Sequence, residues 1–226
     1  MVDRYCERLG PGLWAEPVNA LTNLGFLLAA WAGWLLADRS NKLSWSTGLL
    51  IVALAAVGIG SSLFHTFATP WARLLDIVPI LLFQLYFLWL YLAHVVNLRR
   101  MYSALAVVGF LVAALVGRLF PAVLNGSLMY LPALVLLVGL GIYHYGAQKR
   151  ERLTLVGAAG IFSVSLVFRA IDESICPAIP LGSHFLWHVL SAVVLYLASR
   201  GLILNWPDRQ RIPAAGTTRF NRYGTT

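Results

Sequence analysis

The chain has 226 residues, of which 59% are hydrophobic and only 12% are charged. This composition excludes an ordinary soluble domain and indicates a polytopic membrane protein. The net charge of +8 does not indicate a nucleic-acid partner. The basic residues lie at the ends of apolar segments and in the C-terminal tail, where they can orient the protein and contact anionic lipid head groups.

Seven apolar segments follow one another, each close to the ~20 residues that cross a hydrocarbon core of about 30 Å. They predict an all-α bundle of seven transmembrane helices at residues 17–37, 46–67, 74–96, 101–119, 128–147, 153–171 and 184–204. We expect residues 1–204 to form one membrane domain. Residues 205–226 are basic and contain several prolines and threonines, so we expect a disordered cytoplasmic tail.

The distribution of basic residues predicts the orientation of the bundle. Twelve of the 17 lysines and arginines follow the first, third, fifth and seventh apolar segments, and five lie on the opposite side. Loops rich in Lys and Arg stay in the cytoplasm. The N-terminus is therefore predicted outside and the C-terminus in the cytoplasm.

With this orientation, three histidines are predicted at the same outer depth. His184 and His188 are four residues apart, on one face of the last helix, and His65 lies near the outer end of the second. Three imidazoles with water in the fourth position are typical of a catalytic zinc site. The alternative is a histidine pair at the head-group level that binds no metal. His94 and His144 are each isolated near the cytoplasmic side, and we assign them no function.

Several other polar residues are predicted near these histidines. Asp76, expected in the first turn of the third helix, could move a proton from the attacking water to the leaving group. Ser61, one turn from His65, could donate a hydrogen bond to a developing oxyanion. The alternatives are a favourable charge at a helix N-terminus for Asp76 and, for Ser61, a hydrogen bond to its own helix or to a neighbouring one. Arg169 and Asp172, at the outer end of the sixth helix, are candidates for binding the substrate.

Together these motifs resemble the alkaline ceramidase family, within a superfamily of seven-helix membrane hydrolases that also includes adiponectin-receptor-like proteins. Five stretches carry the resemblance in the family's order. They are Cys6-Glu7, the run from Ala15 to Asn23, the serine and histidine of 61–65 with Asp76, Arg169 to Asp172 with Cys176, and His184 to His188.

The resemblance implies a zinc-dependent integral-membrane amidase. His65, His184 and His188 would be zinc ligands, Asp76 the proton shuttle and Ser61 the oxyanion stabiliser. The substrate would be ceramide or a related N-acyl lipid, which enters from the bilayer and is cut to a free fatty acid and a sphingoid base or amine. No protein partner is implied.

The resemblance also implies a calcium site in the N-terminal segment. The matching acids are Asp3, Glu7 and Glu16, and calcium prefers oxygen ligands. The alternative is that these acids form helix caps and salt bridges near the first transmembrane helix.

Cys6 and Cys176 are the only cysteines, and the predicted orientation places both outside. A disulfide between them is chemically permitted in an oxidising compartment and would hold the N-terminal segment over the histidines. Two unpaired thiols are the alternative.

Two other functions remain open at this point. One is a seven-helix lipid receptor or binding protein in which the metal is structural, because a fold does not settle a function. The other is a proton-coupled transporter or haem carrier. The transporter is disfavoured because the ionisable residues do not continue to the cytoplasmic side.

Overall fold

The computed structural model describes residues 5–207, which fold as a bundle of helices. Within this range no strand occurs, and seven helices are long and apolar enough to cross a membrane. The all-α, seven-helix prediction is thus confirmed. The elements are α1 (Pro17–Thr22), α2 (Leu24–Arg39), α3 (Trp45–Phe67), α4 (Pro70–Leu90), the π-helical turn η1 (Tyr91–Val95), α5 (Arg100–Arg118), the 3-10 segment η2 (Val123–Tyr130), α6 (Leu131–Gly146), α7 (Thr154–Ile175) and α8 (His184–Leu204).

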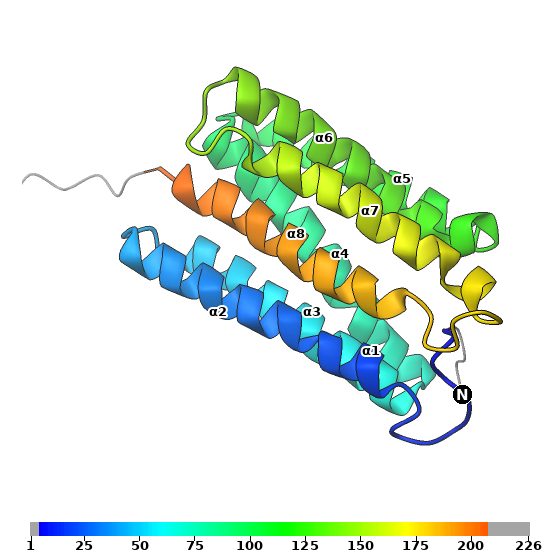
Figure 1. Cartoon of the computed structure of the whole chain (residues 1–226). Coiled ribbons are helices and arrows are strands. Elements are labelled where there is room, and N and C mark those ends of the chain that lie inside the picture. Colours follow the sequence, from blue (N-terminus) through cyan, green and yellow to red (C-terminus); the bar gives the residue numbers. More distant parts are fainter. Residues whose placement is uncertain (1–4, 208–226) are drawn as a thin grey trace, which may run out of the picture.

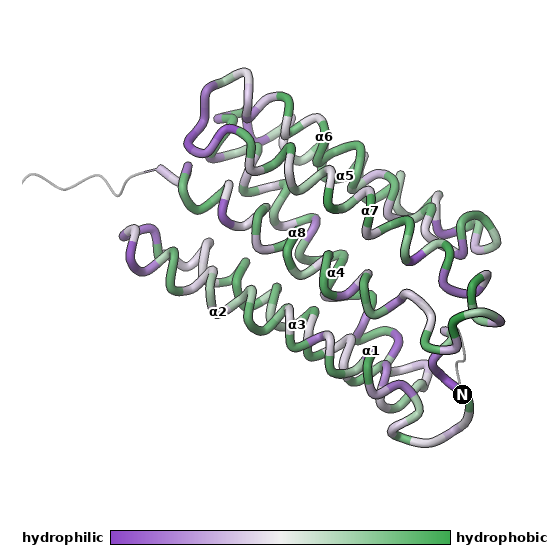
Figure 2. The backbone as a smooth tube through the Cα atoms, viewed as in Figure 1, coloured by the Kyte–Doolittle hydropathy of each residue, from purple (hydrophilic) through white to green (hydrophobic). Residues whose placement is uncertain are grey.

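Helix α8 lies in the middle of the bundle, packed against α2 on one side and α7 on the other (Figure 1). Helix α3 packs against α2 and α4, and α6 packs against α7. Figure 2 shows hydrophobic residues along the helices and most hydrophilic ones near the turns. Many large apolar side chains face outward, among them Val52, Leu105 and Val135. An apolar outer surface of this kind suits a lipid environment.

The structure corrects the expected position of Asp76 in its helix. Helix α4 begins at Pro70, not near residue 74, because the Thr69 side chain accepts the Ala72 N–H and proline suits the first helical position. Asp76 therefore lies in the second turn. The favourable effect of the helix dipole falls off within the first turn, so this effect does not account for a carboxylate here.

Gly60 allows α3 and α4 to approach closely beside Ser61. A Cβ atom at this position would overlap the carbonyl oxygen of Leu75, which precedes Asp76. Only a residue without a side chain permits this contact between helix backbones. The serine on α3 and the aspartate on α4 are brought together by this approach.

Helix α8 ends at Leu204. Of the predicted tail, only residues 205–207 lie within the described part of the chain. The Asn205 side chain accepts the N–H of Arg150 and donates to the carbonyl of Gly201. The expectation for residues 208–226 concerns residues outside the described range.

Candidate metal centre and adjoining cavity

Helix α8 begins with His184, and Asp172 of α7 determines how it begins. One carboxylate oxygen of Asp172 accepts the backbone N–H groups of Ser183 and His184, at 2.6 and 2.9 Å. The other oxygen accepts the N–H of Cys6 at 3.2 Å. Gly182 before them has a φ of +68°, and a Cβ there would overlap the Asp172 carboxylate. The first turn of α8 is thus held to α7 and to the N-terminal segment.

The second histidine of α8 is oriented by a residue of α1. The hydroxyl of Thr22 lies 3.1 Å from Nδ1 of His188. His184 and His188 are both buried, and their ring centroids are 4.5 Å apart, as expected for residues one helical turn apart. With Nδ1 of His188 engaged by Thr22, its Nε2 is the nitrogen left for another partner.

His65 reaches the same place from α3, and a carboxylate holds its ring. Nδ1 of His65 lies 2.5 Å from Oε2 of Glu16, and the imidazole is completely buried. Its ring centroid is 5.2 Å from that of His184 and 4.7 Å from that of His188. A carboxylate that accepts the Nδ1 proton fixes the tautomer in which Nε2 is free.

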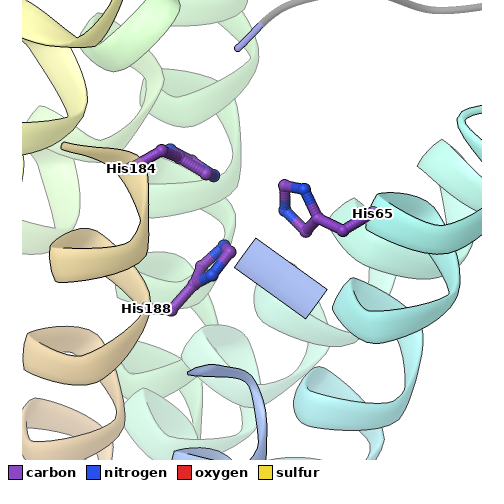
Figure 3. Close-up of side chains that lie close together, drawn as sticks. All are labelled: His65, His184 and His188. Atoms are coloured by element: carbon purple, nitrogen blue, oxygen red, sulfur yellow. The ribbon is translucent and has the colours of Figure 1, made fainter. Parts of the chain in front are cut away.

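The three imidazoles converge on one point, as Figure 3 shows. One nitrogen from each of His65, His184 and His188 lies within 4.8 Å of the other two. Nε2 of His65 and Nδ1 of His184 are buried and have no hydrogen-bond partner. Buried polar atoms without partners are costly, by about 1–3 kcal/mol each. A bound metal ion would satisfy such nitrogens, so the residues fit a metal, and a set of imidazoles suits zinc.

Ser61 and Asp76 lie beside this cluster. The Ser61 and Asp76 side chains interact with each other, and both residues line the cavity described below. The carboxylate also interacts electrostatically with His65 and with Arg169. A proton-accepting group and a hydroxyl donor therefore face the same space as the histidines of α8.

The cavity runs from the histidines into the interior of the bundle. Tyr5, His184 and His188 line one end of it, and lining residues continue along α8 to Ala198. Fourteen helical residues correspond to about 21 Å along the axis. The inner part is lined largely by apolar side chains, among them Phe83, Phe87, Phe110, Leu137 and Val194. A long apolar cavity with a polar end can hold a hydrocarbon chain with its polar group at the metal.

Of the two predicted substrate-binding residues, Arg169 lines the cavity and Asp172 does not. The Arg169 guanidinium is buried, donates to the Asn125 carbonyl and the Ser127 hydroxyl, and lies 5.0 Å from the ring centre of Tyr130. Asp172 is completely buried, and both of its oxygens accept backbone N–H groups. Its place in the structure is that of a residue that positions α8.

The N-terminal acids have protein partners in the structure. The two oxygens of Glu7 accept the N–H groups of Val18 and Asn19 at 2.6 and 2.8 Å, and so cap α1. Glu16 pairs with Arg8 and with His65. These contacts correspond to the helix cap and the salt bridge that are the alternative to a calcium site. Asp3, the third acid of the predicted calcium site, lies outside the described residues.

The charged partners of Glu16 determine its protonation. Burial alone would raise the pKa of its carboxyl, but the hydrogen bonds and positive charges of His65 and Arg8 outweigh burial and lower the pKa. Glu16 is therefore expected to be a carboxylate at neutral pH, as an acceptor for the His65 Nδ1 proton must be.

Tyr5 and Cys6 bring the N-terminal segment over the cluster. The Tyr5 ring stacks on His184 with centroids 3.7 Å apart, and burial raises the pKa of its hydroxyl, which keeps the phenol neutral. Cys6 forms a disulfide with Cys176, and their Cα atoms are 5.2 Å apart. Cys176 directly follows α7, so the segment is joined to the helix that carries Arg169 and Asp172.

The contributions of Tyr5, Arg8 and Thr22 are not indicated by any motif in the sequence. Arg8 is one of the five basic residues that the predicted orientation places outside, and its buried ion pair with Glu16 is not indicated by the sequence. Thr22 lies within the run from Ala15 to Asn23 that resembles the ceramidase family, but the resemblance implies no role for its side chain. Each contact joins segments whose relative position is not encoded by local spacing, so no local signal indicated them.

A comparison with protein families gives an independent result. A family model described as Ceramidase matches residues 9–207, which include all three histidines as well as Ser61 and Asp76. The match begins directly after Arg8. No curated protein matches the chain.

Proposed function

Because the chain belongs to the Ceramidase family, we propose that it is a zinc-dependent membrane amidase. Its substrate would be ceramide or a related N-acyl lipid, and its products a free fatty acid and a sphingoid base or amine. Family membership supports a membrane hydrolase that acts on amide bonds. Zinc and the roles of individual residues are our inference.

One observation carries this proposal. Three imidazole nitrogens converge within 4.8 Å of one another at the polar end of a cavity whose inner part is apolar. Histidine clusters occur in many proteins, but here Asp76 and Ser61 face the same cavity. Metal ligands, a proton carrier and a hydroxyl donor are what amide hydrolysis requires.

The residues of the chain divide the reaction between them. Zinc in such a site supplies Lewis-acid polarisation of the carbonyl and activation of water. Asp76 would accept a proton from the attacking water and deliver it to the amide nitrogen as the C–N bond breaks. The Ser61 hydroxyl would donate to the carbonyl oxygen as negative charge develops on it. A new C–O bond replaces the C–N bond, so the products are a carboxylic acid and an amine.

The cavity suggests how the lipid is held. A hydrocarbon chain would lie between α4 and α8, against residues such as Phe83, Phe87 and Val194, where it is shielded from water. The polar head would then remain near Arg169 and Tyr5. The excess of basic residues in the loops at the other end of the bundle supports an extracytoplasmic position for the histidines.

The test is metal analysis and lipid turnover on the same purified protein. We expect about one zinc per chain in wild type, with release of fatty acid from ceramide or another N-acyl lipid measured by mass spectrometry. His188→Ala should lose the metal and the turnover. His94→Ala, which alters an exposed histidine in η1, is the matched control and should retain both.

Two results would contradict the proposal. Normal fatty-acid release by His188→Ala would exclude a role of the metal site in turnover. Stoichiometric zinc without turnover of any N-acyl lipid would favour the receptor, in which the metal is structural.

A further inference from the structure

Arg8 is a buried arginine in the segment that precedes the first membrane span. Its side chain is 1% exposed, in a segment where an unpaired charge would be costly. Nε donates to Oε1 of Glu16. One terminal nitrogen donates to the carbonyl oxygen of His65 at 2.8 Å. The other donates to the carbonyls of Gly10 and Gly12, at 3.3 and 3.4 Å.

Both carboxylate oxygens of Glu16 have hydrogen-bond partners. Its Oε1 accepts from Arg8, while Oε2 lies 2.5 Å from Nδ1 of His65 and accepts from the Asn19 amide at 3.1 Å. The carboxylate is 2% exposed, so little room remains for water to replace either partner. Arg8, Glu16 and His65 thus form a continuous chain of charged and hydrogen-bonded groups.

Arg8 contacts His65 by two routes. The guanidinium holds the backbone of His65 directly through its carbonyl, and it holds the imidazole indirectly through Glu16. Only a planar group with several fixed N–H donors can make both contacts at once. Removal of Arg8 would leave a buried carboxylate without its positive partner, which is strongly unfavourable.

We propose that Arg8 is a positioning residue for the metal centre, a built-in cation that holds Glu16 as the acceptor of the His65 Nδ1 proton. This keeps Nε2 of His65 directed at the other two imidazoles. Groups that orient a metal-ligating histidine in this way raise its basicity and tune metal affinity. Since a guanidinium already neutralises Glu16, metal binding by the histidines needs no second divalent cation beside them. The inference rests on the proposed zinc site.

The test measures zinc affinity, separately from activity, in Arg8→Met, Arg8→Lys and Arg200→Met. Arg8→Met keeps much of the side-chain volume and removes the charge and the donors. We expect it to weaken zinc binding about 10- to 100-fold, the range seen when such outer partners are removed. Arg8→Lys restores the charge but not both contacts, so its affinity should be intermediate. Arg200→Met breaks an arginine–glutamate pair in another part of the molecule and should bind zinc like wild type.

Cobalt substitution adds a spectroscopic readout that loss of stability alone would not change. The visible bands of Co²⁺ report ligand geometry, and we expect them to differ between Arg8→Met and wild type at saturating metal. Glu16→Gln should reproduce the change, and the double variant should add little, because both residues act on the His65 imidazole through the one hydrogen bond between Glu16 and Nδ1. Calcium titrated into calcium-free protein should leave the zinc Kd unchanged.

The outcomes separate this inference from the proposed function. If wild type binds no zinc, the zinc-amidase proposal itself fails. If wild type binds zinc and Arg8→Met shows the same Kd and the same cobalt spectrum, Arg8 has no positioning role and the amidase proposal stands. If calcium strengthens zinc binding, calcium acts as a second cation at the site. This result would contradict the proposal that the Arg8 guanidinium fills that role. If Arg8→Met does not fold, the comparison of Arg8→Lys with wild type decides in the same way.

Discussion

Asp172 accepts the backbone N–H of His184 at 2.9 Å, so a carboxylate at the end of α7 determines where the first histidine of α8 lies. The same side chain accepts the N–H groups of Ser183 and Cys6. A single buried residue therefore ties α7, α8 and the N-terminal segment together at the candidate metal centre.

Replacement of Asp172 by alanine should leave three buried N–H groups without an acceptor. We expect a destabilisation of about 3 kcal/mol or more, together with weaker zinc binding because His184 is no longer fixed. Thermal unfolding in detergent and a zinc titration measure the two effects. Glu173→Ala changes the exposed neighbouring acid and should have little effect on either. Equal behaviour of the two variants would show that the carboxylate of Asp172 is dispensable.

A methyl group at position 60 should separate α3 from α4. Gly60→Ala places a Cβ against the Leu75 carbonyl, and overpacking of this kind costs about 1–3 kcal/mol. We expect lower stability and a reduced kcat, because Ser61 and Asp76 would move apart. The matched control is Gly48→Ala on the same helix, where a Cβ meets no atom within 4 Å. A Gly60→Ala enzyme with normal kcat would mean that this helix contact does not position the site.

Substitution of the two cavity-lining polar residues should reduce turnover and leave the metal in place. Asp76→Asn removes the proton carrier, for which we expect a loss in kcat of about 100-fold or more. Ser61→Ala removes one oxyanion donor, for which a loss of about 100-fold is expected. Zinc content measured on the same samples should stay at the wild-type value. Ser62→Ala, whose hydroxyl instead donates to the carbonyl of Ala20, should be nearly normal.

The ion pair between Glu151 and Arg200 should make a small part of the stability depend on pH. Hydrogen bonds from Arg200 lower the pKa of the Glu151 carboxyl below its usual 4.5. A lowered pKa means that the stabilisation is complete above pH 4.5 and is lost as the pH falls through the folded value. Both side chains are partly exposed to solvent, so the contribution of the pair should be below about 1 kcal/mol. The difference in Tm between wild type and Glu151→Gln should therefore disappear on acidification. A difference in Tm that grows on acidification would contradict this prediction.

The disulfide between Cys6 and Cys176 should contribute to stability and hold Tyr5 over His184. Reduction, or the variant Cys176→Ser, should lower the free energy of unfolding by about 2–4 kcal/mol. Non-reducing and reducing gels, with thiol labelling of the untreated protein, measure the state of the bond. Free labelling of both thiols in untreated protein would show that the bond is not formed.

The number of spans, the membrane class and the candidate histidines could all be derived from the sequence. A run of ~20 apolar residues is a local property, and so is the spacing of four between His184 and His188. The common depth of His65 and this pair followed from counting alternate spans. The resemblance to the ceramidases then assigned roles to Ser61 and Asp76, which spacing alone left open.

The tertiary structure decided how these residues are held. That Arg8, rather than another group, neutralises Glu16, that Thr22 contacts His188, and that Asp172 binds backbone N–H groups all depend on how separate helices pack. The start of α4 likewise depended on a cap by Thr69 that hydropathy does not register. Hydropathy indicates which segments can cross the bilayer, but it does not specify which residues of separate helices come into contact. The partners of a buried polar group are chosen by the rotation and approach of neighbouring helices, such as the contact that Gly60 permits between α3 and α4.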